Sequence, residues 1–180
     1  DESPPPAREG RPDSVRVGHA NRPLPGYPLA MVVEPYLHPD LTLVTEGSST
    51  RGPLSDRLTE AVDDLIPSID GKELRRLLEA RETQGPTSTP EGVAFPHAMS
   101  KEIDRTLIVA IRVLGGVDFG VPGHPRADLI FALFGSPSNP WNHVRLLARL
   151  ARLMHTEEAR QRMRAAKTAE ALHQHLLEED

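Results

Sequence analysis

Hydrophobic residues form four runs that predict strands along the chain. Residues 41–44 (Leu-Thr-Leu-Val) alternate in the manner of a half-buried strand. The runs over 107–114 and 128–134 are almost entirely apolar, which is typical of strands buried on both faces of a sheet. The short run over 93–95 predicts a further strand. Gly115-Gly116 is predicted to turn the chain after the run over 107–114.

Apolar residues recur at helical spacing before, between and after these runs. The spacing predicts a helix from Leu54 onward, and Pro67 is expected to end it. Asp70 is a candidate N-cap for the next helix, and Glu73 lies three residues after it, which predicts a capping box. Helices alternating with buried strands predict a single α/β domain, with a mixed sheet of four to five strands flanked by helices. The later helices are each expected to follow an N-capping side chain: Asp70, Asn139, Thr156 and Thr168.

The first thirty residues lack this patterning. They hold seven of the 18 prolines, few large apolar side chains, and four acidic residues balanced by four arginines. Burial by such a segment cannot offset the conformational entropy that ordering would cost. We therefore expect a Pro-rich disordered tail or linker over 1–30 and a folded domain over 31–180. Because the chain begins with Asp1 and not Met, we expect a fragment or a processed form.

Composition narrows the function classes. The chain has no cysteine, which excludes a disulfide scaffold, a thiol nucleophile and a thiolate metal site. Its 21 basic and 26 acidic residues give a formal charge of −5, which argues against a nucleic-acid partner. No apolar run approaches the roughly 18 residues that span a bilayer, so we expect no direct membrane insertion. No secretory signal is present at the start, and a cytoplasmic protein is expected.

The eight histidines do not form a recognisable metal motif. No H-E-x-x-H occurs and no His/Asp cluster has ligand spacing, so no metal and no cofactor are predicted. His38 and His124 each precede a proline and are expected in loops.

Two histidines and one arginine have a different context. His97 follows an apolar run and a proline, at a strand end of the kind where α/β proteins bind ligands. His143 falls near the start of the helix expected from 140 onward and three residues before Leu146, so it faces inward; a helix N-terminus attracts anions. Arg81 lies on the apolar stripe of a helix and needs an anion or a carbonyl as partner.

These three side chains allow two interpretations. With the loop hydroxyls of Thr87 and Ser88, they suit the handling of a phosphoryl group on histidine. Composition and spacing alone favour the other interpretation, a structural histidine with satisfied hydrogen bonds and an arginine that buries only its aliphatic stem.

The segment from Arg81-Glu82 through Thr87 to Gly92-Val93-Ala94-Phe95-Pro96-His97 resembles a known phosphorylation site. It is similar to that of the mannitol/fructose-type enzyme IIA domains of the bacterial phosphoenolpyruvate-dependent sugar phosphotransferase system, a group that includes a nitrogen-regulatory branch. The family pattern runs Arg-Glu, a Ser/Thr-Gly-x-Gly loop, then Gly-x-Ala-x-Pro-His, and the spacing fits without a gap. Downstream, Gly116-Val117-Asp118-Phe119 resembles a turn of the family, and the strand at 128–134 and the helix of His143 match in order. The resemblance covers about residues 31–178.

The resemblance implies roles for individual residues. His97 corresponds to the phospho-accepting histidine, His143 to the second active-site histidine, and Arg81 to the arginine that neutralises the phosphoryl group. Thr87 matches the loop hydroxyl residue, and with Ser88 it is expected to bind phosphate. The two loop glycines of the family correspond to Ser88 and Pro90 here, and proline has no backbone N–H to offer a phosphate.

The function implied is that of a phosphoryl carrier. The domain would accept a phosphoryl group on His97 from the phosphocarrier protein HPr, or its nitrogen-regulatory counterpart, and pass it to an enzyme IIB partner without a cofactor. One alternative is a regulatory enzyme IIA-like module, nitrogen-regulatory or tethered to a transporter, that controls a target protein with weak or no phosphotransfer. Another is a small-ligand-binding α/β domain without covalent chemistry.

Overall fold

The computed structural model describes residues 31–47 and 50–180; the tail expected over 1–30 lies outside these residues. The described chain forms five strands and five α-helices, preceded by a 3-10 turn, η1 (Glu34–Tyr36). The strands are β1 (Leu37–Glu46), β2 (Val93–Ala94), β3 (His97–Met99), β4 (Leu107–Val117) and β5 (Ala127–Gly135). The helices are α1 (Arg51–Leu65), α2 (Gly71–Glu82), α3 (Pro140–Leu153), α4 (Glu157–Ala165) and α5 (Ala169–Glu179).

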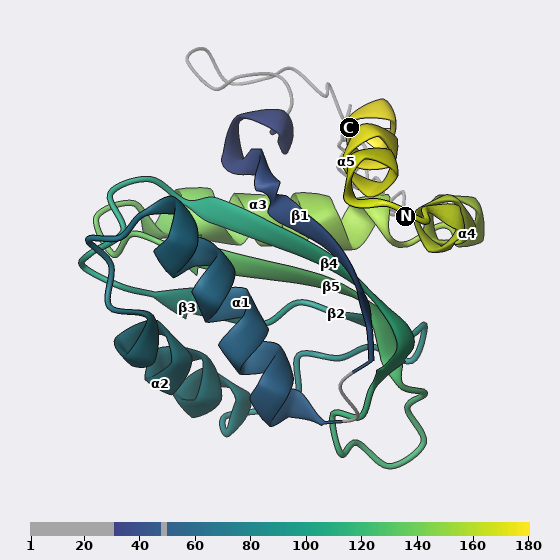
Figure 1. Cartoon of the computed structure of the whole chain (residues 1–180), viewed down its shortest axis with the longest axis horizontal. Coiled ribbons are helices and arrows are strands. Elements are labelled where there is room, and N and C mark those ends of the chain that lie inside the picture. The colour runs from purple at the N-terminus through teal and green to yellow at the C-terminus, as the bar shows by residue number, and fades with distance from the viewer. Residues whose placement is uncertain (1–30, 48–49) are drawn as a thin grey trace, which may run out of the picture.

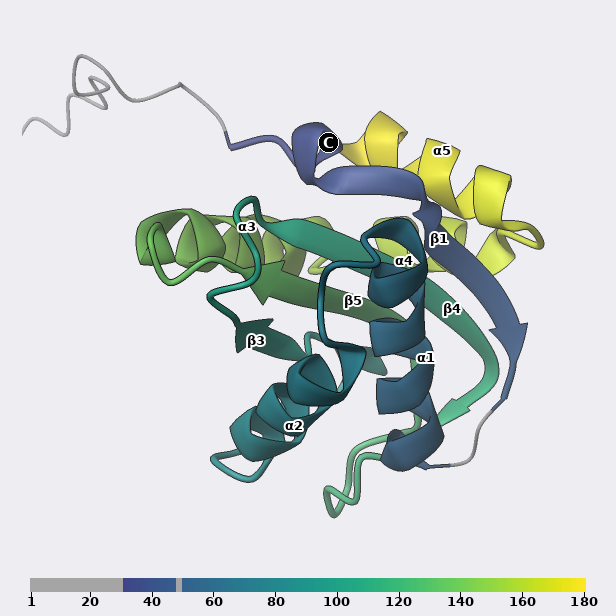
Figure 2. The same cartoon turned by 60° about the vertical axis from the view of Figure 1, so that its left-hand side comes forward.

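The five strands make one mixed sheet in the order β1-β4-β5-β2, with β3 also paired to β5. β4 and β5 are antiparallel, whereas β1, β2 and β3 each run parallel to their neighbours. Helices α1 and α2 cover one face of the sheet, and α3, α4 and α5 lie on the other (Figures 1 and 2). The predicted α/β domain with a mixed sheet is thus confirmed.

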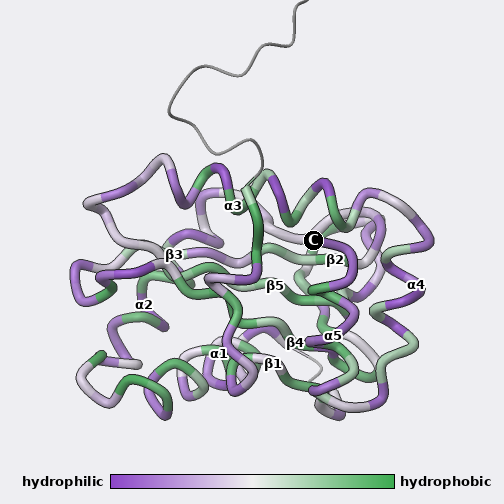
Figure 3. The backbone as a smooth tube through the Cα atoms, turned by 90° about the horizontal axis from the view of Figure 1, so that it is seen from above, coloured by the Kyte–Doolittle hydropathy of each residue, from purple (hydrophilic) through white to green (hydrophobic). Residues whose placement is uncertain are grey.

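Two hydrophobic cores explain the continuous apolar runs. Along β4, Val109 and Ile111 join the core beneath α1 and α2, while Ile108 and Ala110 join the core beneath α3, α4 and α5. Successive strand residues point to opposite faces, so a strand with helices on both sides must be apolar at nearly every position. Figure 3 shows this hydrophobic colouring along β4 and β5.

The four predicted N-caps are confirmed, because each side chain accepts a hydrogen bond from a backbone N–H of the first helical turn. The helix expected to stop at Pro67 ends at Leu65. The capping box, however, is wrong. Glu73 accepts hydrogen bonds from Arg76, and the N–H of Asp70 donates to Glu102.

Three local predictions are corrected by the backbone. Gly115 and Gly116 do not turn the chain: both have positive φ, and they form an irregularity in β4, which continues to Val117 while its register with β5 shifts. His38 is not in a loop, because β1 begins at Leu37 and tolerates Pro39 at a similar register shift. His97 does not simply follow a strand; it begins the three-residue strand β3.

Candidate active site

Parallel pairing of β3 with β5 brings His97 and His143 to the same end of the sheet. His97 opens β3 and is in register with Leu133, near the end of β5. The chain leaves β5 at Gly135 and enters α3 at Pro140, so His143 lies in the first turns of the helix that follows. A strand end followed by a helix N-terminus is a common place for ligands in α/β proteins.

The two hydrogen bonds of the His97 ring define its neutral tautomer. Nδ1 lies 2.9 Å from the Phe95 carbonyl oxygen, which can only accept, so Nδ1 carries the proton. Nε2 lies 2.8 Å from Nε of Arg81, which can only donate, so Nε2 is the acceptor with its lone pair directed at the guanidinium. Arg81 is itself anchored by a 3.0 Å bond from Nη1 to the Gly85 carbonyl.

His143 lies beside His97 and is almost completely buried. The ring centroids are 5.4 Å apart and the ring planes are tilted by 57°. Only 3% of His143 is exposed, and neither ring nitrogen has a hydrogen-bond partner within the described part of the chain. A buried imidazole without partners is costly, which makes it a group poised for a ligand.

Burial keeps both rings neutral. Desolvation is the main reason that the pKa of His97 lies below its usual value, and the charge of Arg81 lowers it further, against the Phe95 carbonyl, which raises it. Desolvation, with His97 second, lowers the pKa of His143 to about 4. At neutral pH the site therefore combines two uncharged imidazoles with one fixed positive charge.

The lowered pKa of His143 predicts a pH-dependent stability. The folded state resists a proton that the unfolded chain accepts near pH 6.5, so this stabilisation is complete above that pH and is lost as the pH falls toward 4. We expect urea unfolding to show a loss of about 3 kcal/mol from this group between pH 7 and pH 4. His143→Gln should remove most of the difference, while His38→Gln, at an exposed histidine of β1, should retain it. Equal pH dependence in both variants would contradict the assignment.

Gly135 makes room for the His143 ring. A Cβ at this position would lie 3.1 Å from Cγ and only 2.5 Å from Nδ1 of His143, and the second distance is closer than Cβ contacts occur in proteins. The end of β5 can thus lie against the imidazole only because residue 135 lacks a side chain.

We therefore expect Gly135→Ala to displace the His143 ring and to cost about 1–3 kcal/mol in the free energy of unfolding. Denaturant titration measures the loss, and the histidine NMR signals report the displacement. Gly52→Ala is the matched control, since its Cβ would meet only the Arg75 guanidinium at 3.9 Å. An unchanged His143 signal in Gly135→Ala would contradict the steric argument.

The loop hydroxyls predicted to bind phosphate have partners of their own. Glu82, next to Arg81, accepts hydrogen bonds from both the Thr87 hydroxyl at 2.7 Å and the Thr87 backbone N–H at 3.1 Å. The Ser88 hydroxyl lies 3.4 Å from Nδ1 of His124, in the turn segment between β4 and β5. The structure thus brings Arg81, His97 and His143 together, and it directs Thr87 and Ser88 to Glu82 and His124. A role for these hydroxyls in phosphate binding stays a prediction.

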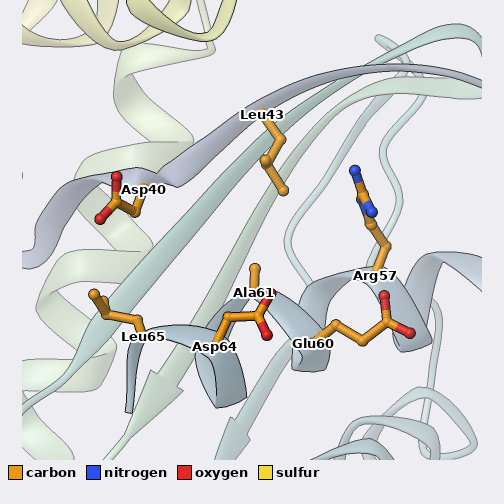
Figure 4. A pocket seen from close by; sticks show the side chains of 7 residues that line it. All are labelled: Asp40, Leu43, Arg57, Glu60, Ala61, Asp64 and Leu65. Carbon is orange, nitrogen blue, oxygen red and sulfur yellow. The ribbon is translucent and has the colours of Figure 1, made fainter. Parts of the chain in front are cut away.

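A separate cavity of about 350 Å³ lies between β1 and α1 (Figure 4). It contains no histidine, and its single cation is Arg57. Three of its lining side chains are aliphatic and three are acidic, so we place no phosphoryl chemistry there. The residues that line it are Asp40, Leu43, Arg57, Glu60, Ala61, Asp64 and Leu65.

Two kinds of feature are absent from the described residues. No group of three or more His, Asp or Glu side chains there could hold a metal ion. No helix within residues 31–47 and 50–180 is both long and apolar enough to cross a membrane.

Comparison with known proteins identifies the family. Residues 56–179 match the family model described as "Phosphoenolpyruvate-dependent sugar phosphotransferase system, EIIA 2". The chain belongs to this family. EIIA domains are phosphotransfer components of that system, and the match runs from within α1 to the end of α5 and includes Arg81, His97 and His143.

Named relatives fall in the regulatory and the sugar-specific branches of EIIA. A nitrogen regulatory protein of Pseudomonas aeruginosa is 28% identical over 142 residues, 79% of this chain and 92% of that protein. The crystal structure of nitrogen regulatory protein IIA-Ntr from Neisseria meningitidis superposes with a TM-score of 0.72 at 21% identity, covering 80% of this chain and 98% of that one. The complex of enzyme IIAMTL and phosphorylated enzyme IIBMTL from Escherichia coli gives 0.61 at 17% identity, covering 72% and 88%.

Sequence reasoning missed several groups that shape this EIIA site. The Phe95 carbonyl is a backbone atom and leaves no signal in the sequence. Gly135 could have been noticed as a glycine that ends an apolar run. Glu82 could have been noticed as the acidic partner beside Arg81; both residues are partly buried. The contact of His124 with the loop joins segments 36 residues apart and depends on the fold.

Proposed function

We propose that the chain is a phosphoryl carrier that accepts a phosphoryl group on Nε2 of His97 from a phosphocarrier protein. The observation that carries this proposal is the hydrogen-bonded neutral ring. The Phe95 carbonyl accepts from the Nδ1 proton, so the lone pair is on Nε2, where it accepts from Arg81. Membership of the EIIA family supports the same reaction class.

The transfer exchanges one P–N bond for another. The lone pair of His97 Nε2 attacks phosphorus, the Nε2–P bond forms, and the bond to the carrier's histidine nitrogen breaks with its electron pair returning to that nitrogen. As Nε2 becomes bonded, positive charge grows on the ring, and the Phe95 carbonyl stabilises it at Nδ1–H. No proton has to leave His97 for the step to occur.

The charge of the phosphoryl oxygens would be balanced by Arg81 and His143. Phosphoryl transfer needs alignment and charge stabilisation more than covalent help from the protein. The Arg81 guanidinium already touches Nε2, so a phosphoryl group on that atom would lie against it. His143, neutral and without a partner, would donate one ring N–H to a phosphoryl oxygen.

Labelling tests this function. The chain incubated with the phosphorylated carrier protein, HPr or its nitrogen-regulatory counterpart, should acquire a phosphoryl label that is labile in acid and stable in base. Mass spectrometry should map it to His97. Absence of label with both carriers would overturn the proposal.

A regulatory role is the second candidate, favoured by the loop between α2 and β2. The N–H groups of Thr87, Thr89 and Gly92 are all bound internally, to Glu82, Val93 and Thr89, and Pro90 has none. A loop that offers few donors to a phosphate would slow turnover and prolong each phosphorylation state. The nitrogen regulatory relative and the IIA–IIB complex indicate the two kinds of downstream partner, a regulated target and an enzyme IIB. Capture with and without His97 phosphorylation distinguishes them.

A further inference from the structure

The segment that leads to His97 folds back on itself as a hairpin over residues 87–95. Phe95 lies at its open end, where its N–H donates to the Thr87 carbonyl at 3.0 Å and its own carbonyl accepts from Nδ1 of His97. The carbonyl that sets the tautomer of His97 is therefore held in place from across the hairpin. The residue pairs that face each other are Thr87 with Phe95, Ser88 with Ala94, and Thr89 with Val93.

Glu82 anchors the open end of this hairpin to α2. Its Oε1 accepts from the Thr87 backbone N–H at 3.1 Å, and its Oε2 accepts from the Thr87 hydroxyl at 2.7 Å. The Glu82 side chain is only 10% exposed and Thr87 is buried, so both bonds are largely shielded from water. Hydrogen bonds to a carboxylate are stronger than those between neutral groups, and a pair of them fixes both the position and the orientation of Thr87.

The last turn of α2 thus acts on both nitrogens of the His97 ring. Arg81 reaches Nε2 directly. Glu82, the next residue, reaches Nδ1 through an unbroken series of hydrogen bonds that passes through Thr87 and Phe95. If Phe95 moves, Nδ1–H loses its acceptor, and the ring can turn or carry its proton on Nε2. A protonated Nε2 has no lone pair with which to attack phosphorus.

We propose that Glu82 is a positioning residue for phosphoryl transfer: by holding Thr87 it keeps the Phe95 carbonyl on Nδ1–H of His97 and the Nε2 lone pair free for phosphorus. This inference rests on the proposed function and adds a residue that acts through Thr87 and Phe95. The precise placement of an attacking atom is worth a large part of the rate of such a transfer, because phosphoryl transfer depends on alignment.

The role assigned to Glu82 depends on its hydrogen bonds more than on its charge. Desolvation is the main cause of the lowered pKa of His97, and the Glu82 charge, which raises this pKa, is the smallest of the four influences on it. Arg51 at the start of α1 lies 3.7 Å from Oε1 of Glu82, but this arginine is half exposed, and exposed ion pairs contribute little. An uncharged side chain of the same shape should therefore preserve the function.

The position of the ring can be measured without any transfer. In the parent chain the ¹⁵N NMR signals of His97 should show a protonated Nδ1 and an unprotonated Nε2. In Glu82→Ala the two signals should move toward each other as both tautomers become populated. The Phe95 amide should exchange about tenfold faster, while the amides of β5 keep the parent rates. A parent chain that takes no phosphoryl label would defeat the proposed function, whereas these signals still decide whether Glu82 positions the ring.

Kinetics supply the second readout. Glu82→Ala should lower the rate at saturating phosphorylated carrier by about 10- to 100-fold with little change in KM, because alignment of the attacking nitrogen is lost and not binding of the carrier. Glu82→Gln should keep most of the rate, since its amide oxygen accepts from the Thr87 N–H and its amide N–H can donate to the Thr87 hydroxyl. Glu79→Ala removes a carboxylate of the same helix that pairs with Arg75, and this matched control should react at the parent rate.

A double variant tests whether Glu82 acts through Thr87. Thr87→Val removes the hydroxyl bond and keeps the backbone N–H, so its loss of rate should be smaller than that of Glu82→Ala. The double variant Glu82→Ala/Thr87→Val should be no slower than Glu82→Ala alone, because the two side chains belong to one series of contacts.

Four results would overturn the proposal. One is a Glu82→Gln variant as slow as Glu82→Ala, which would assign the effect to the charge. Another is a Glu82→Ala variant with the parent ¹⁵N signals and the parent exchange rate at Phe95. A third is a rise in KM without a loss of rate at saturation, which would place Glu82 in carrier binding. The last is a double variant whose loss equals the product of the two single losses.

Discussion

His97→Ala should abolish the acid-labile phosphoryl label and leave the domain folded. The imidazole is half-buried, and its replacement removes two hydrogen bonds, one to the Phe95 carbonyl and one from Arg81. Both bonds orient the ring and do not contribute to packing of the hydrophobic core. The label should therefore fall to background, because the variant lacks the ring nitrogen that faces the Arg81 guanidinium. Circular dichroism and urea unfolding should show a stability change of about 1–2 kcal/mol.

The experiment needs controls that separate the nucleophile from its neighbours. His38→Ala, at an exposed histidine of β1, should label as the parent chain does. His143→Ala should still label, but slowly, because it loses a donor and not the attacking atom. Label that persists in His97→Ala, or moves to His143, would contradict the assignment of Nε2 as the nucleophile.

The sheet and most helix boundaries were accessible from sequence because one physical pattern dominated each segment. β4 and β5 lie between two helix layers, and this burial on both faces produced apolar runs that no other element of a small domain requires. The N-caps Asp70, Asn139, Thr156 and Thr168 were predictable because capping is a local interaction between a side chain and the next turn.

The errors arose where the deciding contact was not local. Strand β3 is three residues long, and only its pairing with β5 makes it a strand. Gly115 and Gly116 have the composition of a turn, yet pairing on both sides of them keeps the chain in the sheet. Composition alone does not distinguish a glycine turn from a glycine bulge.

The site likewise has features that the sequence predicts and features that depend on contacts made only in the fold. The motif resemblance brought Arg81, His97 and His143 together in advance, and the structure places them in contact as a group. The tautomer of His97 could not be predicted, because it depends on a backbone carbonyl two residues away that points at Nδ1 only in this fold.

Arg81→Ala should slow phosphorylation of His97 by about 10²–10³-fold, the effect of losing one preorganised charged donor to a developing anion. The side chain reaches Nε2 at 2.8 Å and is fixed by the Gly85 carbonyl, so the guanidinium already lies where the phosphoryl oxygens arrive, and its Nε–H passes from Nε2 to one of them. The loss of the Gly85 hydrogen bond should cost only about 1 kcal/mol in unfolding free energy, which separates the kinetic effect from stability. Arg76→Ala, on the exposed side of the same helix, is the matched control and should phosphorylate at the parent rate.

The pH profile distinguishes charge stabilisation from a purely structural role of Arg81. Its positive charge contributes to the low pKa of His97, so Arg81→Ala should raise that pKa and move the acid limb of the rate profile to higher pH. Arg81→Lys retains the charge but not the planar guanidinium, and we expect it to keep the acid limb in place while recovering only part of the rate. An acid limb unmoved in Arg81→Ala, together with a normal rate, would show that the guanidinium neither lowers the pKa of His97 nor stabilises the phosphoryl oxygens.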